Sequence, residues 1–243
     1  MITLFKKEIR TFLSSLIGYI AICVFLLLVG LFLWILPSDS NILKNGYAGL
    51  ESLFNLAPWV FLFLIPAITM RSLSDEKKSG TIEFLLTKPL TDMQIILAKY
   101  FAGITLVLFS LLPTLLYYYS IYRLGNPVGN IDLGGTWGSY IGLFFLASAF
   151  TSIGIFTSSL TDNQIISFII SVFLCFFCFI GFEYISELDL FGKVDEFILT
   201  LGINYHYTSM SRGVIDTRDV IYYVSLNALF MLLTKTVLES RKW

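Results

Sequence analysis

The side chains with the greatest capacity for recognition chemistry lie in residues 71–92, the most charged stretch of the chain. Four charged residues follow one another here: Asp75, Glu76, Lys77 and Lys78. The pair Ser79–Gly80 then interrupts any helix. Charges of both signs in one short run suit a contact with another protein, where they set orientation and specificity.

A short amphipathic helix is predicted directly after this interruption, over residues 81–88. Three apolar residues share one of its faces: Ile82, Leu85 and Leu86. Glu83 lies on another face, and Pro89 ends the helix because a residue before proline is pushed out of the helical region. Two turns of helix are not stable alone in water. The segment must be held by its flanking spans, by lipid or by a partner, and an interfacial helix without a partner is the open alternative.

Other reactive residue types are few and isolated. Cys175 and Cys178 form a C-x-x-C, but no histidine, aspartate or second cysteine pair stands nearby to complete a metal shell. We interpret both as small apolar residues in lipid. The only histidine, His206, stands among tyrosines and is interpreted as an interfacial polar residue. The sequence predicts no metal site and no cofactor.

Two further features argue against an enzyme. The chain contains no G-x-x-x-x-G-K-[ST] loop, which is the usual means of binding ATP phosphates. An intramembrane enzyme needs ionisable or nucleophilic groups facing one another at membrane depth. The apolar runs lack such groups, since Lys99, Glu183 and Lys235 lie near the ends of runs, where long side chains reach the interface.

The rest of the chain has the composition of a membrane protein. Of 243 residues, 56% are hydrophobic and 14% are charged, and the mean hydropathy is +0.80. A soluble domain of this length needs a larger charged shell. The net charge of −1 provides no basic field for nucleic acid, so we expect a lipid bilayer as the surroundings and no nucleic-acid partner.

Six apolar runs are long enough to cross a bilayer, which requires roughly 20 mostly apolar residues. They are residues 15–36, 53–70, 95–119, 137–160, 164–185 and 220–238. We predict an all-α integral membrane protein with one transmembrane domain over residues 1–243 and an outer segment at residues 186–219. Small residues recur every four positions in the fourth run. They predict close helix packing, either within the subunit or at a seam between subunits.

The distribution of basic residues predicts the orientation. With the N-terminus inside, eleven of the sixteen lysines and arginines fall on the cytoplasmic side. Segment 71–92 and both termini are then cytoplasmic. Residues 1–14 have the spacing of an amphipathic helix, with Lys6, Lys7 and Arg10 on its polar side. We predict a helix in the inner interface with this basic side on lipid headgroups; an extended basic flank is the alternative.

A repeated motif marks the starts of two of the spans. L-T-D-M-Q-I-I precedes the third span, and L-T-D-N-Q-I-I precedes the fifth. Each predicts a capping box, in which a threonine caps the helix and a glutamine three residues later returns the hydrogen bond. The predicted pairs are Thr91 with Gln94, and Thr161 with Gln164.

The stretch D-E-K-K-S-G-T-I-E-F-L-L-T-K-P resembles the E-x-x-x-G-T-x-E-x-L-L-x-x-P segment of ABC-2 type permeases. The matching positions are Glu76, Gly80, Thr81, Glu83, Leu85, Leu86 and Pro89. In that family the segment is a coupling helix that docks on a separate nucleotide-binding subunit. The resemblance extends over essentially the whole chain. It implies a type II ABC exporter-like fold and an ATPase contact that includes the apolar face from Ile82 and the charges at residues 75–78.

Within this family, the chain is most similar to the permeases of gliding-motility-associated ABC transporters. That resemblance implies a GldA-like ATPase as one partner, and a second permease copy or a GldG-like paralogue as another. It also implies a location in the bacterial inner membrane. The expected function is to couple ATP hydrolysis in the partner to export or to work on the cell envelope. A passive anchor or scaffold within such a complex is the alternative function.

Overall fold

The computed structural model of the chain is built from helices, and it describes residues 1–86, 90–189 and 192–240. Six helical segments are long and apolar enough to cross a membrane. They are Gly18–Ile35, Glu51–Lys78, Asp92–Leu124, Leu133–Leu160, Gln164–Glu187 and Thr217–Glu239. No strand occurs in these described residues. The predicted all-α class with six spans is therefore confirmed.

The helices follow one another with short connections. The first half of the chain contains α1 (Ile2–Leu13), α2 (Leu16–Gly30), α3 (Ile42–Asn45), α4 (Glu51–Thr69), α5 (Ser74–Lys78), α6 (Thr81–Leu86), α7 (Asp92–Leu111) and α8 (Leu115–Leu124). The second half contains α9 (Leu133–Leu160), α10 (Gln164–Phe176), α11 (Phe182–Glu187), α12 (Lys193–Thr200), α13 (Ile203–Ser211) and α14 (Thr217–Glu239). Short π or 3₁₀ turns extend α2, join α7 to α8 and join α10 to α11.

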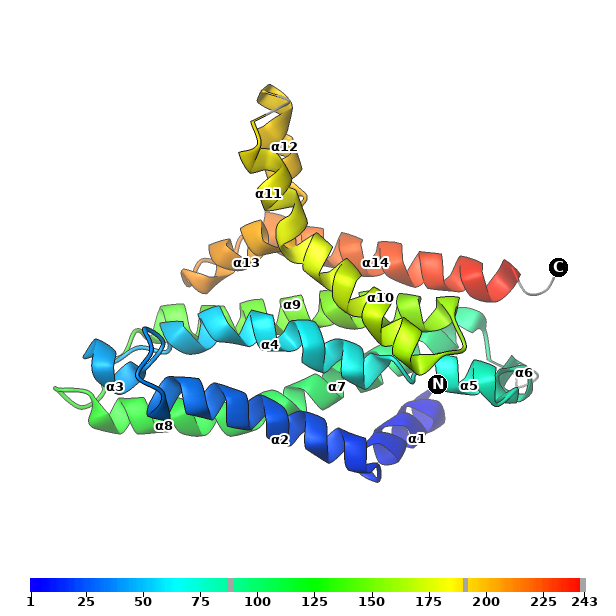
Figure 1. Cartoon of the computed structure of the whole chain (residues 1–243), viewed down its shortest axis with the longest axis horizontal. Helices are drawn as coiled ribbons and strands as arrows, with labels where there is room; N and C mark the ends of the chain where they lie inside the picture. The colour runs from blue at the N-terminus through cyan, green and yellow to red at the C-terminus, as the bar shows by residue number, and fades with distance from the viewer. Residues whose placement is uncertain (87–89, 190–191, 241–243) are drawn as a thin grey trace.

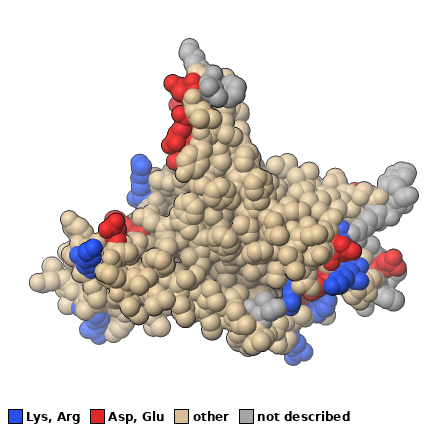
Figure 2. Space-filling model, in the orientation of Figure 1, with Lys and Arg blue, Asp and Glu red and all other residues tan. Residues whose placement is uncertain are grey.

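The spans lie side by side, and the two ends of the bundle differ (Figure 1). α1, α5, α6 and the last turn of α14 lie at one end, which we call the α5 end. α3 and the connection between α8 and α9 lie at the opposite end. Charged side chains gather near both ends, whereas the middle of the visible face is almost free of them (Figure 2). This distribution suits a bundle whose middle is surrounded by hydrocarbon.

α9 is the central span, and it packs against α4, α7, α10, α13 and α14. Its small residues make this possible, because they allow the backbones of neighbouring helices to approach closely. A Cβ at Gly142 would lie 3.2 Å from Met210 Cβ, and one at Gly138 would lie 2.6 Å from Gly213 Cα. The small residues of the fourth span therefore serve packing inside the subunit.

Gly154→Ala is expected to lower the stability of the protein, because its Cβ would overlap with Thr69 Oγ1 and lie 2.8 Å from Thr69 Cβ. Overpacking of this kind costs about 1–3 kcal/mol. Thermal unfolding of the purified protein in detergent measures the loss. In a Thr69→Gly background the overlapping atoms are absent, so the same substitution should cost much less. An equal loss in both backgrounds would contradict this account of the contact between α4 and α9.

The two predicted capping boxes have different outcomes. Thr91 caps α7 as predicted, because its hydroxyl accepts from the Gln94 N–H at 3.3 Å and the Gln94 side chain accepts from the Thr91 N–H at 3.2 Å. The second prediction is wrong, since α10 begins at Gln164 and is capped by Asn163 instead of Thr161. Asparagine is a stronger cap than threonine, and the first motif has methionine at this position.

The outer segment predicted at residues 186–219 contains two helices, α12 and α13. α11 and α12 project from the bundle across the direction of the spans (Figure 1); we call them the arm. α12 contacts α11 and α13. At the end of the segment, Asp216 caps α14 by accepting the Arg218 N–H at 2.9 Å, and this hydrogen bond lowers the pKa of the Asp216 carboxyl.

Candidate functional site

The segment singled out by the sequence consists of two short helices joined by a left-handed turn. α5 follows α4 after only a few residues, and α6 begins at Thr81. Gly80 has a φ of +67°, a conformation that glycine adopts without steric cost. The Ser79 and Thr81 hydroxyls lie 2.8 Å apart across this turn. The predicted helix is present through Leu86, and residues 87–89, including Pro89, lie outside the described part of the structure.

Exposure divides the segment into an outward and an inward part. In α5, the turn and the part of α6 whose side chains the structure describes, five residues are exposed: Lys78, Ser79, Gly80, Thr81 and Glu83. We call them the docking surface. Ile82 is only 7% exposed, and it belongs to a buried apolar cluster with Leu73, Ile96 and Tyr100. Ile82 thus belongs to the interior of the bundle and does not point outward, while the side chains of Leu85 and Leu86 lie outside the described part.

The charged residues before the turn fix α5 to the junction of α9 and α10. Arg71 Nε donates to Gln164 Oε1 at 3.1 Å, and Gln164 Nε2 donates to Asp75 Oδ1. Lys77 Nζ donates to the Ser159 carbonyl. The Gln164 side chain is therefore used between helices, which is a second reason why it does not complete a capping box. Asp75 and Lys77 hold α5 in place through contacts inside the subunit.

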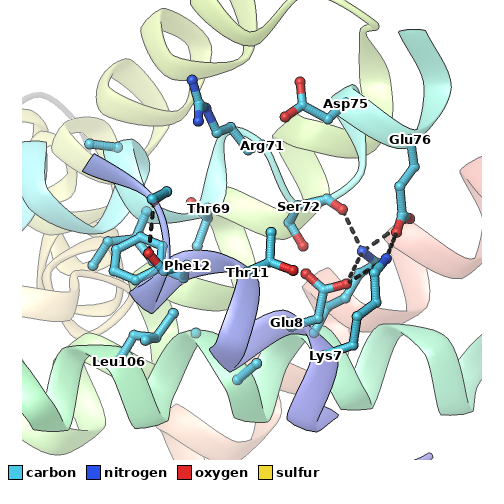
Figure 3. A pocket seen from close by; sticks show the side chains of 16 residues that line it. Lys7, Glu8, Thr11, Phe12, Thr69, Arg71, Ser72, Asp75, Glu76 and Leu106 are labelled. Atoms are coloured by element: carbon cyan, nitrogen blue, oxygen red, sulfur yellow. Dashed lines mark hydrogen bonds and ion pairs between the residues drawn. The ribbon is translucent and has the colours of Figure 1, made fainter. Parts of the chain in front are cut away.

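A buried lysine joins α5 to two further helices (Figure 3). Lys99 Nζ, on α7, lies 3.1 Å from Glu8 Oε1 on α1 and 3.0 Å from Glu76 Oε2 on α5. It also donates to the Ser72 carbonyl at 2.6 Å. The Lys99 side chain is 1% exposed. A buried ammonium group must be compensated by partners, and two carboxylates and a carbonyl provide that compensation.

Lys7 extends this network to the protein surface. Its Nζ lies 3.3 Å from Glu76 Oε1 and 3.6 Å from Glu8 Oε1, and its side chain is 55% exposed. The predicted N-terminal helix is present as α1, with Lys6 and Arg10 exposed. Lys7 also has contacts inside the subunit, since its ammonium group pairs with the Glu76 and Glu8 carboxylates, and its contact with lipid headgroups stays a prediction. We call Lys7, Glu8, Glu76 and Lys99 the ion network.

A cavity of about 190 Å³ lies beside the ion network, between α1, α7 and the junction of α4 with α5. Charged groups, including Arg71 and Asp75, line one part of it, and Phe12 and Leu106 line another (Figure 3). The four charges of the ion network balance in sign, so the network acts as a neutral joint between three helices. Its geometry suits the holding of α1 and α5 together rather than chemistry on a substrate.

The sequence did not predict the ion network. Lys99 was expected to reach the membrane interface, but the structure buries it. The one available signal was Glu8, an acidic residue beside Lys7 on an otherwise basic helix face.

The two cysteines of the C-x-x-C are buried and free: Cys175 lies near the end of α10, and Cys178 lies in the π turn that follows it. Among the described residues, no group of three or more His, Cys, Asp or Glu side chains could hold a metal ion.

Six apolar spans and a polar segment braced at one end define a multi-pass membrane protein. The family described as ABC-2 family transporter protein matches residues 2–238, and the chain belongs to this family. It is therefore a membrane permease of the ABC transporter type, a transmembrane component with an ABC ATPase as partner. Among curated proteins, none is significantly similar in sequence.

Proposed function

We propose that this permease couples ATP hydrolysis in a separate ATPase subunit to movement of its own spans, and that the ATPase binds the docking surface. The exposure of Lys78, Thr81 and Glu83 on a turn that is braced from inside carries this proposal. A partner needs accessible charges for orientation and a rigid support that transmits force. The docking surface offers both. Leu85, Leu86 and Pro89 complete the proposed contact by their match to the coupling-helix motif.

The bracing of α5 indicates how a force on the docking surface reaches the spans. Asp75 and Lys77 link α5 to the α9–α10 junction, and Glu76 links it to α1 and α7. α5 also follows directly from α4. Movement of α5 therefore displaces the ends of several spans together, as a rigid body. In this proposal Asp75, Glu76 and Lys77 act through the interior, as positioning residues for the ATPase contact.

The narrower assignment rests on sequence resemblance. The sequence resembles GldF, the permease of the gliding-motility-associated ABC transporter. By this resemblance, a GldA-like ATPase and a second permease, either another copy or a GldG-like paralogue, complete the complex in the bacterial inner membrane. Both termini and the docking surface are then cytoplasmic, which agrees with the basic residues near the α5 end (Figure 2). A scaffold without transport is the second candidate, favoured only by the motility resemblance.

Glu83→Arg is expected to release the ATPase while leaving the permease folded, because Glu83 is exposed and the reversed charge repels the partner group that recognises it. The complex is purified from native membranes, and the bound ATPase is identified and quantified. Glu51→Arg is the matched control, since Glu51 is also exposed but lies at the first turn of α4, at the opposite end of the bundle. Equal recovery of the ATPase with both variants would refute the docking surface.

Nucleotide-dependent movement separates the coupling function from the scaffold. A spin or fluorescence label at Lys78 and another at Lys44 report the distance between the two ends of one subunit. A coupling permease should show a change in this distance, or in mobility at Lys78, when ATP binds to the purified complex. A passive scaffold should show the same values with and without nucleotide. The unliganded complex and a complex with a hydrolysis-deficient ATPase serve as controls.

A further inference from the structure

The only histidine of the chain is buried between three helices near the base of the arm. His206, on α13, is 8% exposed. Its Nδ1 lies 2.7 Å from Asp219 Oδ1 on α14, and its Nε2 lies 2.9 Å from the carbonyl oxygen of Thr200 at the end of α12. Asp219 is also buried, at 5% exposure. The sequence placed no partner beside this histidine.

Both contacts are satisfied at once when the imidazole ring and the Asp219 carboxyl together carry two protons. The Thr200 carbonyl only accepts, so Nε2 carries a hydrogen. At 2.7 Å, Nδ1 and Asp219 Oδ1 must share a further proton, because two lone pairs would otherwise face each other. The pair is thus either imidazolium with carboxylate or neutral imidazole with carboxylic acid. In both forms it is neutral overall, which makes burial of the two groups tolerable.

The same cluster attaches the arm to α14. Tyr222, on α14, stacks on the His206 ring with 3.9 Å between ring centroids, and its hydroxyl donates to the Leu201 carbonyl at 2.6 Å. On α13, Asn204 donates to Glu183 of α11 at 2.8 Å. The imidazole and Tyr222 therefore hold the end of α12, and with it the arm, against the start of the last span.

The other buried titratable groups around the pair, among the described residues, do not supply the positive charge that the shared proton provides. The tyrosine, cysteine and acidic groups on the packed elements are Tyr205 and Tyr207 of α13, Tyr222 and Tyr223 of α14, Cys178 at the α10–α11 junction, Glu183 of α11, and Asp195 and Glu196 of α12. None of these is a cation at neutral pH, and the two arginines at the ends of α13 and α14, Arg212 and Arg218, have exposed side chains. The second oxygen of Asp219, Oδ2, is buried and makes no hydrogen bond to the described residues. Among the buried groups of the described residues, the shared proton is thus the positive counterpart of this carboxylate.

We propose that His206 and Asp219 form a proton-binding site that fastens the arm to α14 and releases it when the proton is lost. When the pair gives up one proton to water, the neutral ring keeps its hydrogen on Nδ1, where it donates to the Asp219 carboxylate. The lone pair of Nε2 then faces the Thr200 carbonyl oxygen, so the contact that holds the end of α12 becomes repulsive. The arm is held at low pH and loosened at higher pH. This inference is independent of the ATPase contact.

The single histidine allows a direct test of the proton. The protein is labelled with ¹⁵N-histidine, carries a purification tag without histidine, and is studied by NMR in nanodiscs across a pH series. We expect the wild type to bind the proton at least about tenfold more tightly than Asp219→Asn, because the carboxylate favours the imidazolium. The asparagine is nearly isosteric, so the variant should fold. Equal proton affinity in both proteins would overturn the proposal.

Amide hydrogen exchange over residues 193–211 tests the release of the arm. After correction for intrinsic rates, wild-type protection should fall as pH rises through the NMR midpoint, whereas His206→Gln should show no such step. Tyr222→Phe is the matched control: it loses the bond to the Leu201 carbonyl but keeps the proton site, so exchange should rise at every pH with the step retained. A step that persists in His206→Gln, or that is absent from the wild type, would overturn the proposal.

Discussion

Lys99→Met is expected to be the most destabilising single substitution at the α5 end. It removes the ammonium group that lies 3.1 Å from Glu8 and 3.0 Å from Glu76, and it leaves both carboxylates with little water. The Glu8 and Glu76 side chains are only 19% and 10% exposed. Breaking a buried ion pair from one side costs about 3–5 kcal/mol. Thermal unfolding in detergent, followed by the loss of monodisperse protein, measures this effect.

Two controls distinguish lost charge compensation from lost packing. Lys99→Arg keeps the positive charge and should retain most of the stability. The triple variant Lys99→Met, Glu8→Gln, Glu76→Gln also removes the two opposing carboxylates. It should therefore recover much of the stability that Lys99→Met loses, because replacing a whole buried ion pair by neutral residues is often tolerated. If Lys99→Met were as stable as the wild type, or if the triple variant were no better than the single one, the ion network would not hold these helices.

The triple variant also separates stability from transmission. It is expected to fold and to insert, but it lacks the ionic joint between α1, α5 and α7. If the joint carries force from the docking surface, ATP hydrolysis in the complex should continue while its effect on the spans weakens. If the joint serves stability alone, coupling should survive in the triple variant. The Lys78 and Lys44 label pair reads out this difference directly.

The spans and the position of the docking surface could be predicted because their signals are local. Runs of about 20 apolar residues identify spans whatever their packing. The pair Ser79–Gly80 and the amphipathic residues after it locate a turn and a short helix from neighbours in sequence alone. Burial was less predictable: the periodicity places Ile82 on the apolar face expected to meet the ATPase, but Ile82 is buried in a cluster that includes residues of α7 and α14. Periodicity shows which residues share a face and does not show what covers that face.

The pairings that join distant segments could not be predicted, since they arise only when helices pack. Lys99 and Glu8 are 91 residues apart in sequence, and Arg71 and Gln164 are 93 apart. Each residue alone has an ordinary explanation at a helix end. His206 likewise acquires its role from Asp219, which sequence reasoning left unassigned. The partners of a buried charge determine whether its burial is compensated, and the sequence of one chain does not identify those partners.

Gly80→Val is expected to weaken the ATPase contact through the backbone alone. A Cβ at this position would meet nothing within 4 Å, so no steric clash with a neighbour is involved. The φ of +67° is the cause, since a β-branched residue pays about 1–2 kcal/mol in the left-handed region. If the ATPase recognises the native turn, binding loses a similar free energy, which corresponds to about a tenfold lower affinity. Titration of the purified ATPase against the permease in nanodiscs measures it.

The chain itself provides the control that isolates recognition from strain. Gly46 has a φ of +70°, also has nothing within 4 Å of its Cβ position, and lies at the end of α3, at the opposite end of the bundle. Gly46→Val should therefore carry the same backbone cost and leave ATPase affinity unchanged. Gly80→Asn should be tolerated, because asparagine adopts the left-handed conformation more readily. Equal affinity for Gly80→Val and Gly46→Val would mean that the ATPase does not recognise this turn.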